Sequence, residues 1–332
     1  MAVLELQAID ADRFHGEIVP GGRPVVLRGL VAHWPAVKAA LAGDEALFDY
    51  LGGFDQGQPV GTLVGDPKAG GRFFYDADLT GFNFQRGPAR LRKSFDFLLA
   101  QRGADPPTPL AVQSIPADVH LPGFSTENLA PLLGPEIEPL LWLGNRVIVA
   151  AHQDPYENLA CVVAGRRRFT LFPPEAVGDL YVGPLEKTPG GPAISLVSFE
   201  APDLAAHPRF ERALAVAETV ELAPGDALYI PYLWWHHVRS LEPVNLLTNY
   251  WWDNEPAGRG RAMDAFLHAV LALRALPPHQ RQAWKAGFEH YVFGDPDTAT
   301  AHLPEGVRGM LGALGEDDAR QLLRALGQKL SA

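Results

Sequence analysis

The sequence predicts a β-rich core followed by an all-helical C-terminal region. Glycine and proline account for 33 and 30 of the 332 residues, which is about 19% of the chain where average usage is roughly 12%. No collagen-like repeat accompanies this excess, so it indicates many tight turns between short strands. Strand-like runs in the middle of the chain and helical periodicity after Trp252 support the same division.

The composition argues against several classes of protein. Hydrophobic residues make up 47% of the chain and charged residues 20%, which is enough apolar material for a folded core. The formal net charge of −11 argues against a nucleic-acid partner, because such proteins usually carry a basic face. Cys161 is the only cysteine, so we expect neither an intramolecular disulfide nor a cysteine-based zinc site. No secretory signal and no long apolar run is apparent, and we therefore expect a cytoplasmic protein without membrane association.

The N-terminal third mixes short predicted strands and helices. Pro24–Leu30 predicts a buried strand, and Ala36–Leu41 predicts a short helix. Ser94–Leu99 is expected to begin another helix, with Ser94 as its N-cap. Between them, Gly52–Gly71 is rich in Gly, Asp and Pro and is expected to be a loop.

The middle of the chain carries most of the strand signals. Gly165–Arg168 lies between two of the strand-like runs and predicts a hairpin turn. A Pro- and Gly-rich excursion follows from Pro173 to Thr219, with one helical piece at Pro208–Ala217. A segment of this length in a compact domain is often functional, for example as a lid. The predicted strands are Arg146–Ala151, Leu159–Ala164, Phe169–Phe172, Ala227–Ile230 and Val244–Trp252.

Helical periodicity replaces the strand signals after Trp252. Arg261–Leu276 places Met263, Phe266, Leu267, Val270 and Leu271 on one face of an amphipathic helix. Further helices are expected within Gln280–Phe293 and Glu305–Leu330. We expect the boundary near Asn254–Gly260, which divides the chain into a β-rich domain, 1–254, and a helical region, 255–332.

The run His152-Gln153-Asp154 is the first candidate metal-binding pattern. Side chains two residues apart on a strand share a face, so a strand entering from Val147–Ala151 would aim His152 and Asp154 the same way. With one distant histidine they would form a 2-His-1-carboxylate set, which leaves coordination positions open on Fe(II). A surface His/Asp pair is the competing interpretation, because the pattern alone is common.

The third ligand is expected from the segment 225–238, GDALYIPYLWWHHV. His236 and His237 face opposite ways if this segment is extended, so only one of them can join the site. Strand geometry does not choose between them. The other histidine would then pack against aromatic neighbours such as Trp235.

Several further motifs occur together and in order. HQDPYENLACVVAGRRRFTLFPP is followed by GDALYIPYLWWHHVRSL and NLLTNYWW, and it is preceded by PVVLRGLVAHWP and LWLG. With these motifs the sequence resembles the JmjC/cupin-like Fe(II)- and 2-oxoglutarate-dependent oxygenases, in particular the factor-inhibiting-HIF type and its bacterial cupin-like relatives. The resemblance covers about Pro24 to Trp252. It implies a double-stranded β-helix (a cupin or jelly-roll core) with added N-terminal elements and a helical C-terminal tail.

The resemblance also implies a set of site residues. The family uses the histidine directly after the tryptophan pair, so His152, Asp154 and His236 are implied as the catalytic iron ligands. The residues implied to line the pocket of the co-substrate, 2-oxoglutarate, are Asn158, Arg167, Asn249 and Trp251.

Two positions depart from the family pattern. Arg167 stands where the family usually has a lysine that binds the distal carboxylate of 2-oxoglutarate. Val149 stands where the family usually has a hydroxyl residue that contacts the same carboxylate. The missing hydrogen bond would have to come from Tyr156, Ser114 or another group.

The resemblance implies a hydroxylase that consumes O2 and 2-oxoglutarate and acts on a protein side chain or a small molecule. It also implies a homodimer formed through the C-terminal helices. The alternative is a cupin-type binding or sensing protein that keeps a metal but turns over no oxo acid, and Val149 and Arg167 favour that alternative.

Overall fold

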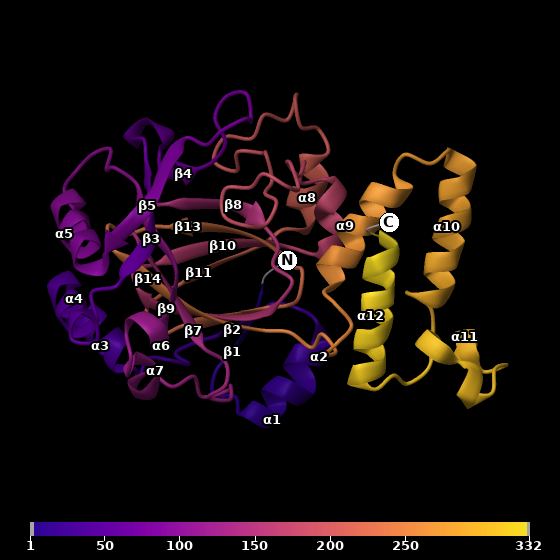
Figure 1. Ribbon diagram of the computed structural model, residues 1–332. Coiled ribbons are helices and arrows are strands. Elements are labelled where there is room, and N and C mark those ends of the chain that lie inside the picture. The colour runs from indigo at the N-terminus through magenta and orange to yellow at the C-terminus, as the bar shows by residue number, and fades with distance from the viewer. Residues whose placement is uncertain (1–2, 331–332) are drawn as a thin grey trace. The chain divides into compact units, whose positions relative to one another are not determined.

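The computed structural model describes residues 3–330. The chain divides into two compact units, of which the first ends at Asp253 and the second begins at Asn254. The first unit holds the strands and the second is helical (Figure 1).

Two β-sheets make up the core of the first unit within the described residues. The larger sheet has nine strands, which are, in spatial order, β1 (Leu4–Leu6), β2 (Val25–Leu27), β12 (Ala227–Ile230), β9 (Glu157–Ala164), β14 (Asn245–Trp252), β7 (Pro139–Gly144), β6 (Leu110–Pro116), β3 (Pro59–Gly65) and β5 (Phe84–Arg90). The smaller sheet has five, which are β11 (Glu218–Leu222), β10 (Arg167–Phe172), β13 (Trp235–Ser240), β8 (Ile148–His152) and β4 (Arg72–Phe73). This β-rich jelly-roll core with added helices confirms the predicted fold class.

Helices surround the strands of the first unit in chain order. The α-helices are α1 (Ala11–Arg13), α2 (Val19–Gly21), α3 (Pro35–Ala42), α4 (Asp44–Gly52), α5 (Leu91–Gln101), α6 (Ala117–His120), α7 (Phe124–Glu127) and α8 (Phe210–Val216). Short turns of other helix types are η1 (Phe14–Ile18), η2 (Pro67–Ala69) and η3 (Pro174–Gly178).

The larger sheet is buried on both faces, and β9 shows how the sequence encodes this. Leu159, Cys161 and Val163 point to one face, into a core shared with the N-terminal helices. Ala160 and Val162 point to the other face, into a core shared with the smaller sheet. Because alternate residues of a strand face opposite ways, a strand covered on both sides needs an uninterrupted apolar run.

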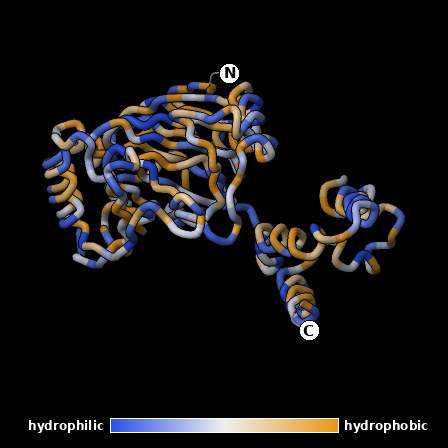
Figure 2. Tube along the Cα trace, turned by 90° about the horizontal axis from the view of Figure 1, so that it is seen from above, coloured by the Kyte–Doolittle hydropathy of each residue, from blue (hydrophilic) through white to orange (hydrophobic). Residues whose placement is uncertain are grey.

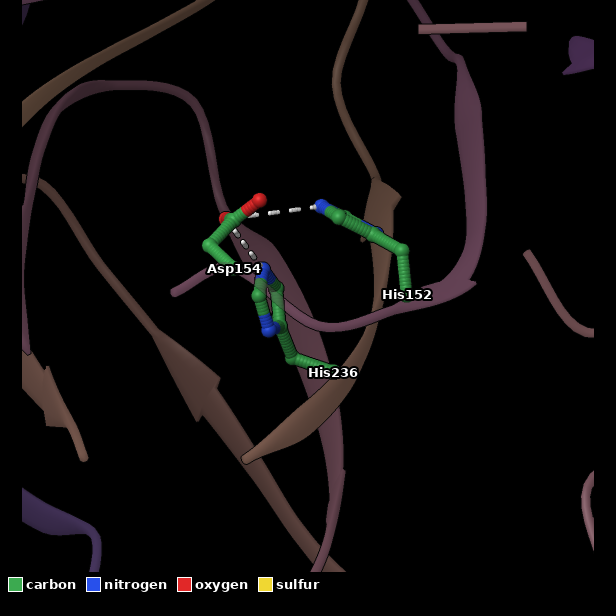
Figure 3. A group of neighbouring side chains, drawn as sticks. All are labelled: His152, Asp154 and His236. Atoms are coloured by element: carbon green, nitrogen blue, oxygen red, sulfur yellow. Dashed lines mark ion pairs between the residues drawn. The ribbon is translucent and has the colours of Figure 1, made fainter. Parts of the chain in front are cut away.

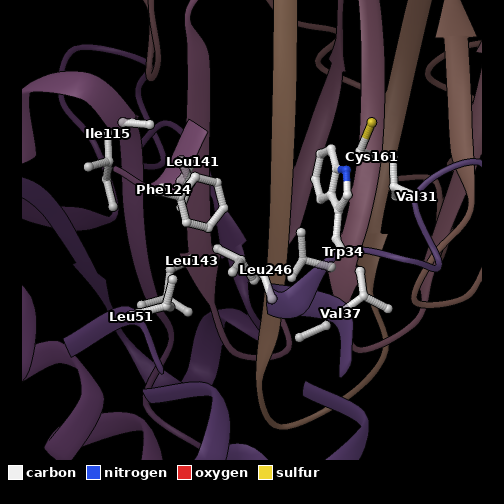
Figure 4. Close-up of a cluster of buried hydrophobic side chains, with 14 of the residues drawn as sticks. Val31, Trp34, Val37, Leu51, Ile115, Phe124, Leu141, Leu143, Cys161 and Leu246 are labelled. Carbon is white, nitrogen blue, oxygen red and sulfur yellow. The ribbon is translucent and has the colours of Figure 1, made fainter. Parts of the chain in front are cut away.

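The outer core packs α3, α4 and α7 against the larger sheet (Figure 4). Trp34, directly before α3, is fully buried there, and its indole N–H donates to the Leu129 carbonyl at 2.8 Å. Leu51 of α4 and Phe124 of α7 lie in the same cluster. Cys161 is part of it as well, which makes the only cysteine a buried packing residue. Its strand β9 is separate from β8, so the cysteine does not share a strand with His152.

The predicted hairpin at Gly165–Arg168 is wrong. The strand before the turn, β9, pairs with β12 and β14, whereas the strand after it, β10, pairs with β11 and β13. The turn therefore crosses from the larger sheet to the smaller one. Gly165 has φ +70°, and a Cβ atom there would collide with the Asn245 side chain and the Val244 carbonyl, so this crossing requires glycine.

Two predictions for the N-terminal third are also wrong. The expected loop Gly52–Gly71 contains strand β3, which pairs with β5 and β6; its two glycines hid the strand signal, because glycine has low strand propensity. Ser94 lies buried inside α5, which begins at Leu91, and is not its cap.

The second unit contains the helices predicted after Trp252. They are α9 (Ala262–Leu273), α10 (Pro278–Tyr291), α11 (Pro296–Thr300) and α12 (Glu316–Leu330), with short turns η4 (Glu305–Val307) and η5 (Gly309–Leu311). Hydrophobic and hydrophilic residues alternate along these helices (Figure 2). Leu271 of α9 is 80% exposed and Phe266 is 53% exposed. Among the described residues, no helix is both long and apolar enough to cross a membrane.

Candidate metal centre and adjoining cavity

Three side chains from separate parts of the first unit meet at one point (Figure 3). His152, Asp154 and His236 each offer a ligand atom, and these atoms lie within 4.8 Å of one another. Asp154 Oδ2 is 3.8 Å from His152 Nε2 and 3.5 Å from His236 Nε2. Two imidazoles and one carboxylate facing a common point are the donor set of a facial triad.

Strand pairing places the two histidines together. In the antiparallel pair of β8 and β13, His152 stands directly opposite His236, and the register shifts between His236 and Val238. The expectation that His152 and Asp154 share a continuous strand is wrong, because β8 ends at His152. Asp154 reaches the site from the following turn, where its backbone carbonyl accepts a hydrogen bond from the Leu233 amide at 3.1 Å.

Backbone carbonyls orient both imidazole rings. His152 Nδ1 lies 3.0 Å from the Ala150 carbonyl, and His236 Nδ1 lies 3.0 Å from the Trp234 carbonyl. Each Nδ1–H therefore donates to a carbonyl, which leaves Nε2 as the lone-pair nitrogen directed at the common point.

Burial and charge set the protonation states that a metal requires. Burial lowers the pKa of His152 to about 4, with a further contribution from His236. For Asp154, burial raises the pKa, but the hydrogen bond from His236 and the charges of both histidines outweigh it, so the net shift is downward. At neutral pH the site thus offers a neutral His152 and an ionised Asp154, which is the state that binds a cation.

Glu157 holds the two loops of the site against each other. Its carboxylate accepts a hydrogen bond from the Tyr229 hydroxyl at 2.6 Å and from the Tyr232 amide at 3.1 Å. Tyr229 is on β12, just before the segment that carries His236, while Glu157 follows Asp154 by three residues. The sequence analysis missed this contact because no local pattern links two residues 72 positions apart.

His237 lies outside the trio. Its ring stacks on Phe199 with centroids 4.5 Å apart, and its Nε2 is 3.7 Å from the Glu200 carboxylate. The pKa of His237 is lowered to about 3, chiefly by burial and then by the positive charges of Arg72, His152 and Arg239. The contact with Glu200 does not offset these effects.

A cavity adjoins the trio on the inner face of the sheets. The three trio residues line it together with all four predicted pocket residues, Asn158, Arg167, Asn249 and Trp251. Asn249 donates from its side-chain amide to Asn158 Oδ1 at 2.6 Å, and both are buried. Trp251 stacks on Tyr156 with centroids 5.7 Å apart.

Arg167 is a buried cation in this cavity. It is 6% exposed, and its Nη2 donates to the Trp142 carbonyl at 3.2 Å. Its Nε has no acceptor, and no carboxylate pairs with it among residues 3–330. Burial lowers its pKa to about 10, yet it stays protonated at neutral pH. Its neighbours Arg166 and Arg168 are solvated and pair with Glu242 and Glu221.

The hydroxyl missing at Val149 is not supplied by the two side chains considered first. Val149 lines the cavity, whereas Ser114 is exposed and neither Ser114 nor Tyr156 lines it. Gln113 does line it, as does Trp142. Both were missed as site residues, although Trp142 belongs to the LWLG motif.

The excursion between β10 and β11 closes one side of the cavity. Ile194 bridges to His152, and the excursion residues Pro189 and Gly190 line the wall. Tyr75 donates from its hydroxyl to the Lys187 carbonyl at 2.6 Å. Arg86 donates to the Pro189 carbonyl at 2.6 Å. These contacts fasten the excursion to the segment that connects β4 and β5.

Comparison with known proteins identifies the family. The profile of the cupin-like domain matches residues 11–258, well over half of the chain. The chain belongs to the cupin-like domain family. The JmjC-named relatives below confirm the resemblance to JmjC/cupin-like proteins.

Curated relatives match this cupin-like protein over different lengths. HSPB1-associated protein 1 from Bos taurus is 37% identical over 153 residues, which cover 44% of this chain and 31% of the relative. The lysine-specific demethylase JMJ31 from Arabidopsis thaliana is 38% identical over 105 residues, or 32% of this chain and 19% of the relative. The bifunctional peptidase and (3S)-lysyl hydroxylase JMJD7 from Homo sapiens is 29% identical over 279 residues, or 73% of this chain and 81% of the relative. The match thus spans about a third of HSPB1-associated protein 1.

The burial of His237 predicts that this cupin-like protein loses stability in mild acid. An unfolded histidine takes up its proton near pH 6.5, whereas folded His237 resists until about pH 3. The folded state is therefore favoured fully above pH 6.5 and loses this contribution as the pH falls, by about 2 kcal/mol between pH 6.5 and pH 5. Urea unfolding at pH 7 and pH 5 measures the loss.

The variant His237→Phe is the matched control for this prediction. It keeps an aromatic ring against Phe199 and removes the titrating group, while His152 contributes equally in both proteins. The free energy of unfolding of the variant should fall by less between the two pH values. An equal fall in both proteins would contradict the assignment.

Proposed function

We propose that the protein is an Fe(II)- and 2-oxoglutarate-dependent oxygenase that hydroxylates its substrate. One observation carries the proposal: the trio of His152, Asp154 and His236 opens into the same cavity as a buried, unpaired Arg167. A cation site and an anion site in one cavity match a co-substrate that binds a metal at one end and carries a carboxylate at the other.

The trio residues fit Fe(II). Two neutral imidazole nitrogens and one carboxylate are the donors that non-haem Fe(II) oxygenases use, and they leave other coordination positions open. The carbonyls of Ala150 and Trp234 fix the ring orientations before any ligand arrives, so metal binding needs little reorganisation.

Arg167 fits the distal carboxylate of 2-oxoglutarate. A buried guanidinium without a counter-ion is costly, and a carboxylate guest would relieve this cost through a bidentate, charge-assisted hydrogen bond. Arg167 lies four residues before Leu171, which pairs with His236, so the two positions are about 13 Å apart along the strands. We propose Asn158, Asn249 and Trp251 as the residues that line the path between them.

The chain's own residues would position the reactants and limit water. When bound, iron(II) would supply O2 activation, with 2-oxoglutarate oxidised to succinate and CO2 while a substrate C–H bond is hydroxylated. Asp154 and the two histidines would hold the metal from one side. Pro189, Gly190 and Ile194 of the excursion would shield the other side from solvent.

A protein side chain is the substrate that the relatives favour over a small molecule. The human relative is named as a lysyl hydroxylase and the Arabidopsis relative as a lysine-specific demethylase. Both names specify lysine residues of proteins. We therefore propose a protein substrate for this chain.

The test of the function is co-substrate turnover. Protein loaded with Fe(II) should convert 2-oxoglutarate to succinate in air, slowly without substrate and faster with a suitable one, measured by mass spectrometry. His152→Ala protein treated in the same way is the control for free iron. Iron binding without succinate above that control would reject the oxygenase and favour the metal-retaining binding protein.

Adjacent histidines provide a matched test of the ligand set. His236→Ala should lower the bound iron to a small fraction of one ion per chain, because the trio loses a nitrogen ligand. His237→Ala makes the same chemical change at a buried neighbour and should keep the iron. Metal content after anaerobic desalting measures both. Equal retention by the two variants would refute His236 as a ligand.

We also propose that residues 255–332 are a separate helical region through which two copies associate. Phe266 and Leu271 of α9 leave apolar surface exposed in a single chain, and burying such surface favours association.

The dimer proposal predicts the effect of a single charge on α9. Leu271→Glu should shift the protein to monomer in size-exclusion chromatography with light scattering, because it would bury a carboxylate. His268→Glu, on an exposed polar side chain of the same helix, should leave the mass unchanged. A wild-type protein that is monomeric at all concentrations would contradict the proposal.

A further inference from the structure

The cavity beside the trio contains more hydrogen-bond donors than its walls can satisfy. Among residues 3–330, Trp142 Nε1, Trp251 Nε1 and Arg167 Nε are buried and have no acceptor. All three side chains line this cavity. Buried indole and guanidinium N–H groups usually have a partner, so the surplus points to a ligand that brings acceptor oxygens.

The strand register separates these donors along the cavity. Trp251 pairs with Asn158 and stacks on Tyr156, two residues after Asp154, so it lies at the trio's end. Trp142 stands opposite Leu247, which is two same-face steps away from Trp251 along β14. The tryptophan rings still approach to 5.8 Å, so the indoles form a continuous wall.

Trp142 belongs to the end of the cavity where Arg167 lies. The Trp142 carbonyl accepts the hydrogen bond from Arg167 Nη2 at 3.2 Å. The guanidinium head is thereby held beside the backbone of Trp142. One carboxylate seated on Arg167 is then placed next to the residue whose indole N–H lacks an acceptor.

We propose that the indole N–H of Trp142 is the second donor to the distal carboxylate of the oxo acid, alongside Arg167. This inference rests on the proposed function, because it assumes that 2-oxoglutarate enters this cavity. It makes Trp142 a residue that selects a dicarboxylate over a monocarboxylate. Trp251, at the trio's end, contributes to both kinds of acid alike.

The test compares two oxo acids on the metal-loaded protein under anaerobic conditions. Trp142→Phe keeps an aromatic ring and removes the N–H, so its Kd for 2-oxoglutarate should rise about 10- to 100-fold, as expected for a hydrogen bond to a charged group. Its Kd for 2-oxobutyrate, which has no distal carboxylate, should not change. Trp251→Phe is the matched control and should keep the ratio of the two Kd values at the wild-type level.

A rescue separates a lost donor from damaged packing. Val149 lines the same cavity, so Val149→Thr in the Trp142→Phe background offers a new hydroxyl and should recover part of the affinity for 2-oxoglutarate alone. A wild-type ratio of Kd values in Trp142→Phe would overturn the proposal. An equal fall of the ratio in both tryptophan variants would overturn it too.

A measurement on the wild-type sequence covers the case in which Trp142→Phe does not fold. In Zn(II)-loaded protein labelled with 15N-tryptophan, one indole N–H resonance should move downfield with 2-oxoglutarate and stay in place with 2-oxobutyrate. That resonance should persist in Trp251→Phe. If every indole resonance responds equally to both acids, the proposal fails. Absence of any 2-oxoglutarate binding to the metal-loaded wild type would instead reject the proposed function.

Discussion

The antiparallel pairing of β8 with β13 is the constraint on which the rest of the site depends. It sets His152 directly opposite His236, and backbone carbonyls two residues before each histidine orient the rings. The turn after β8 then needs only to bring Asp154 to the same point. Glu157 secures this turn to the loop before His236 through Tyr229 and Tyr232. A metal site of this kind is thus a property of sheet register more than of any single loop.

Burial on both faces of the larger sheet explains why the cavity is chemically unusual. The outer face is filled by apolar side chains and the N-terminal helices. The inner face faces the smaller sheet and must accommodate Arg167, Asn158 and Asn249 among apolar neighbours. Polar groups buried without partners destabilise a folded protein, so they persist where a ligand compensates for them. The unpaired guanidinium and the unpaired indoles therefore carry functional information.

Sequence reasoning recovered the site better than it recovered the path of the chain. Motifs such as HQD and WWHH placed the trio residues and the four pocket residues correctly around one cavity, because these residues lie close to short, distinctive patterns. The sheet to which each strand belongs was not predictable locally: the turn at Gly165 looks like a hairpin and instead links two sheets. The contact between Glu157 and Tyr229 was likewise invisible, since it depends on which strands become neighbours. Trp142 carried a motif but no polar signal, because an unpaired indole nitrogen is recognised only once its surroundings are known.

The central claim is that one cavity binds a metal at the trio and an oxo acid that reaches Arg167. The most direct test is an anaerobic titration of the Fe(II)-loaded protein with 2-oxoglutarate, followed by visible absorption. The account predicts a metal-to-ligand charge-transfer band that saturates at one equivalent per chain and requires much more 2-oxoglutarate in Arg167→Ala. Iron-loaded protein that develops no band, or a band whose titration is unchanged in Arg167→Ala, would contradict it.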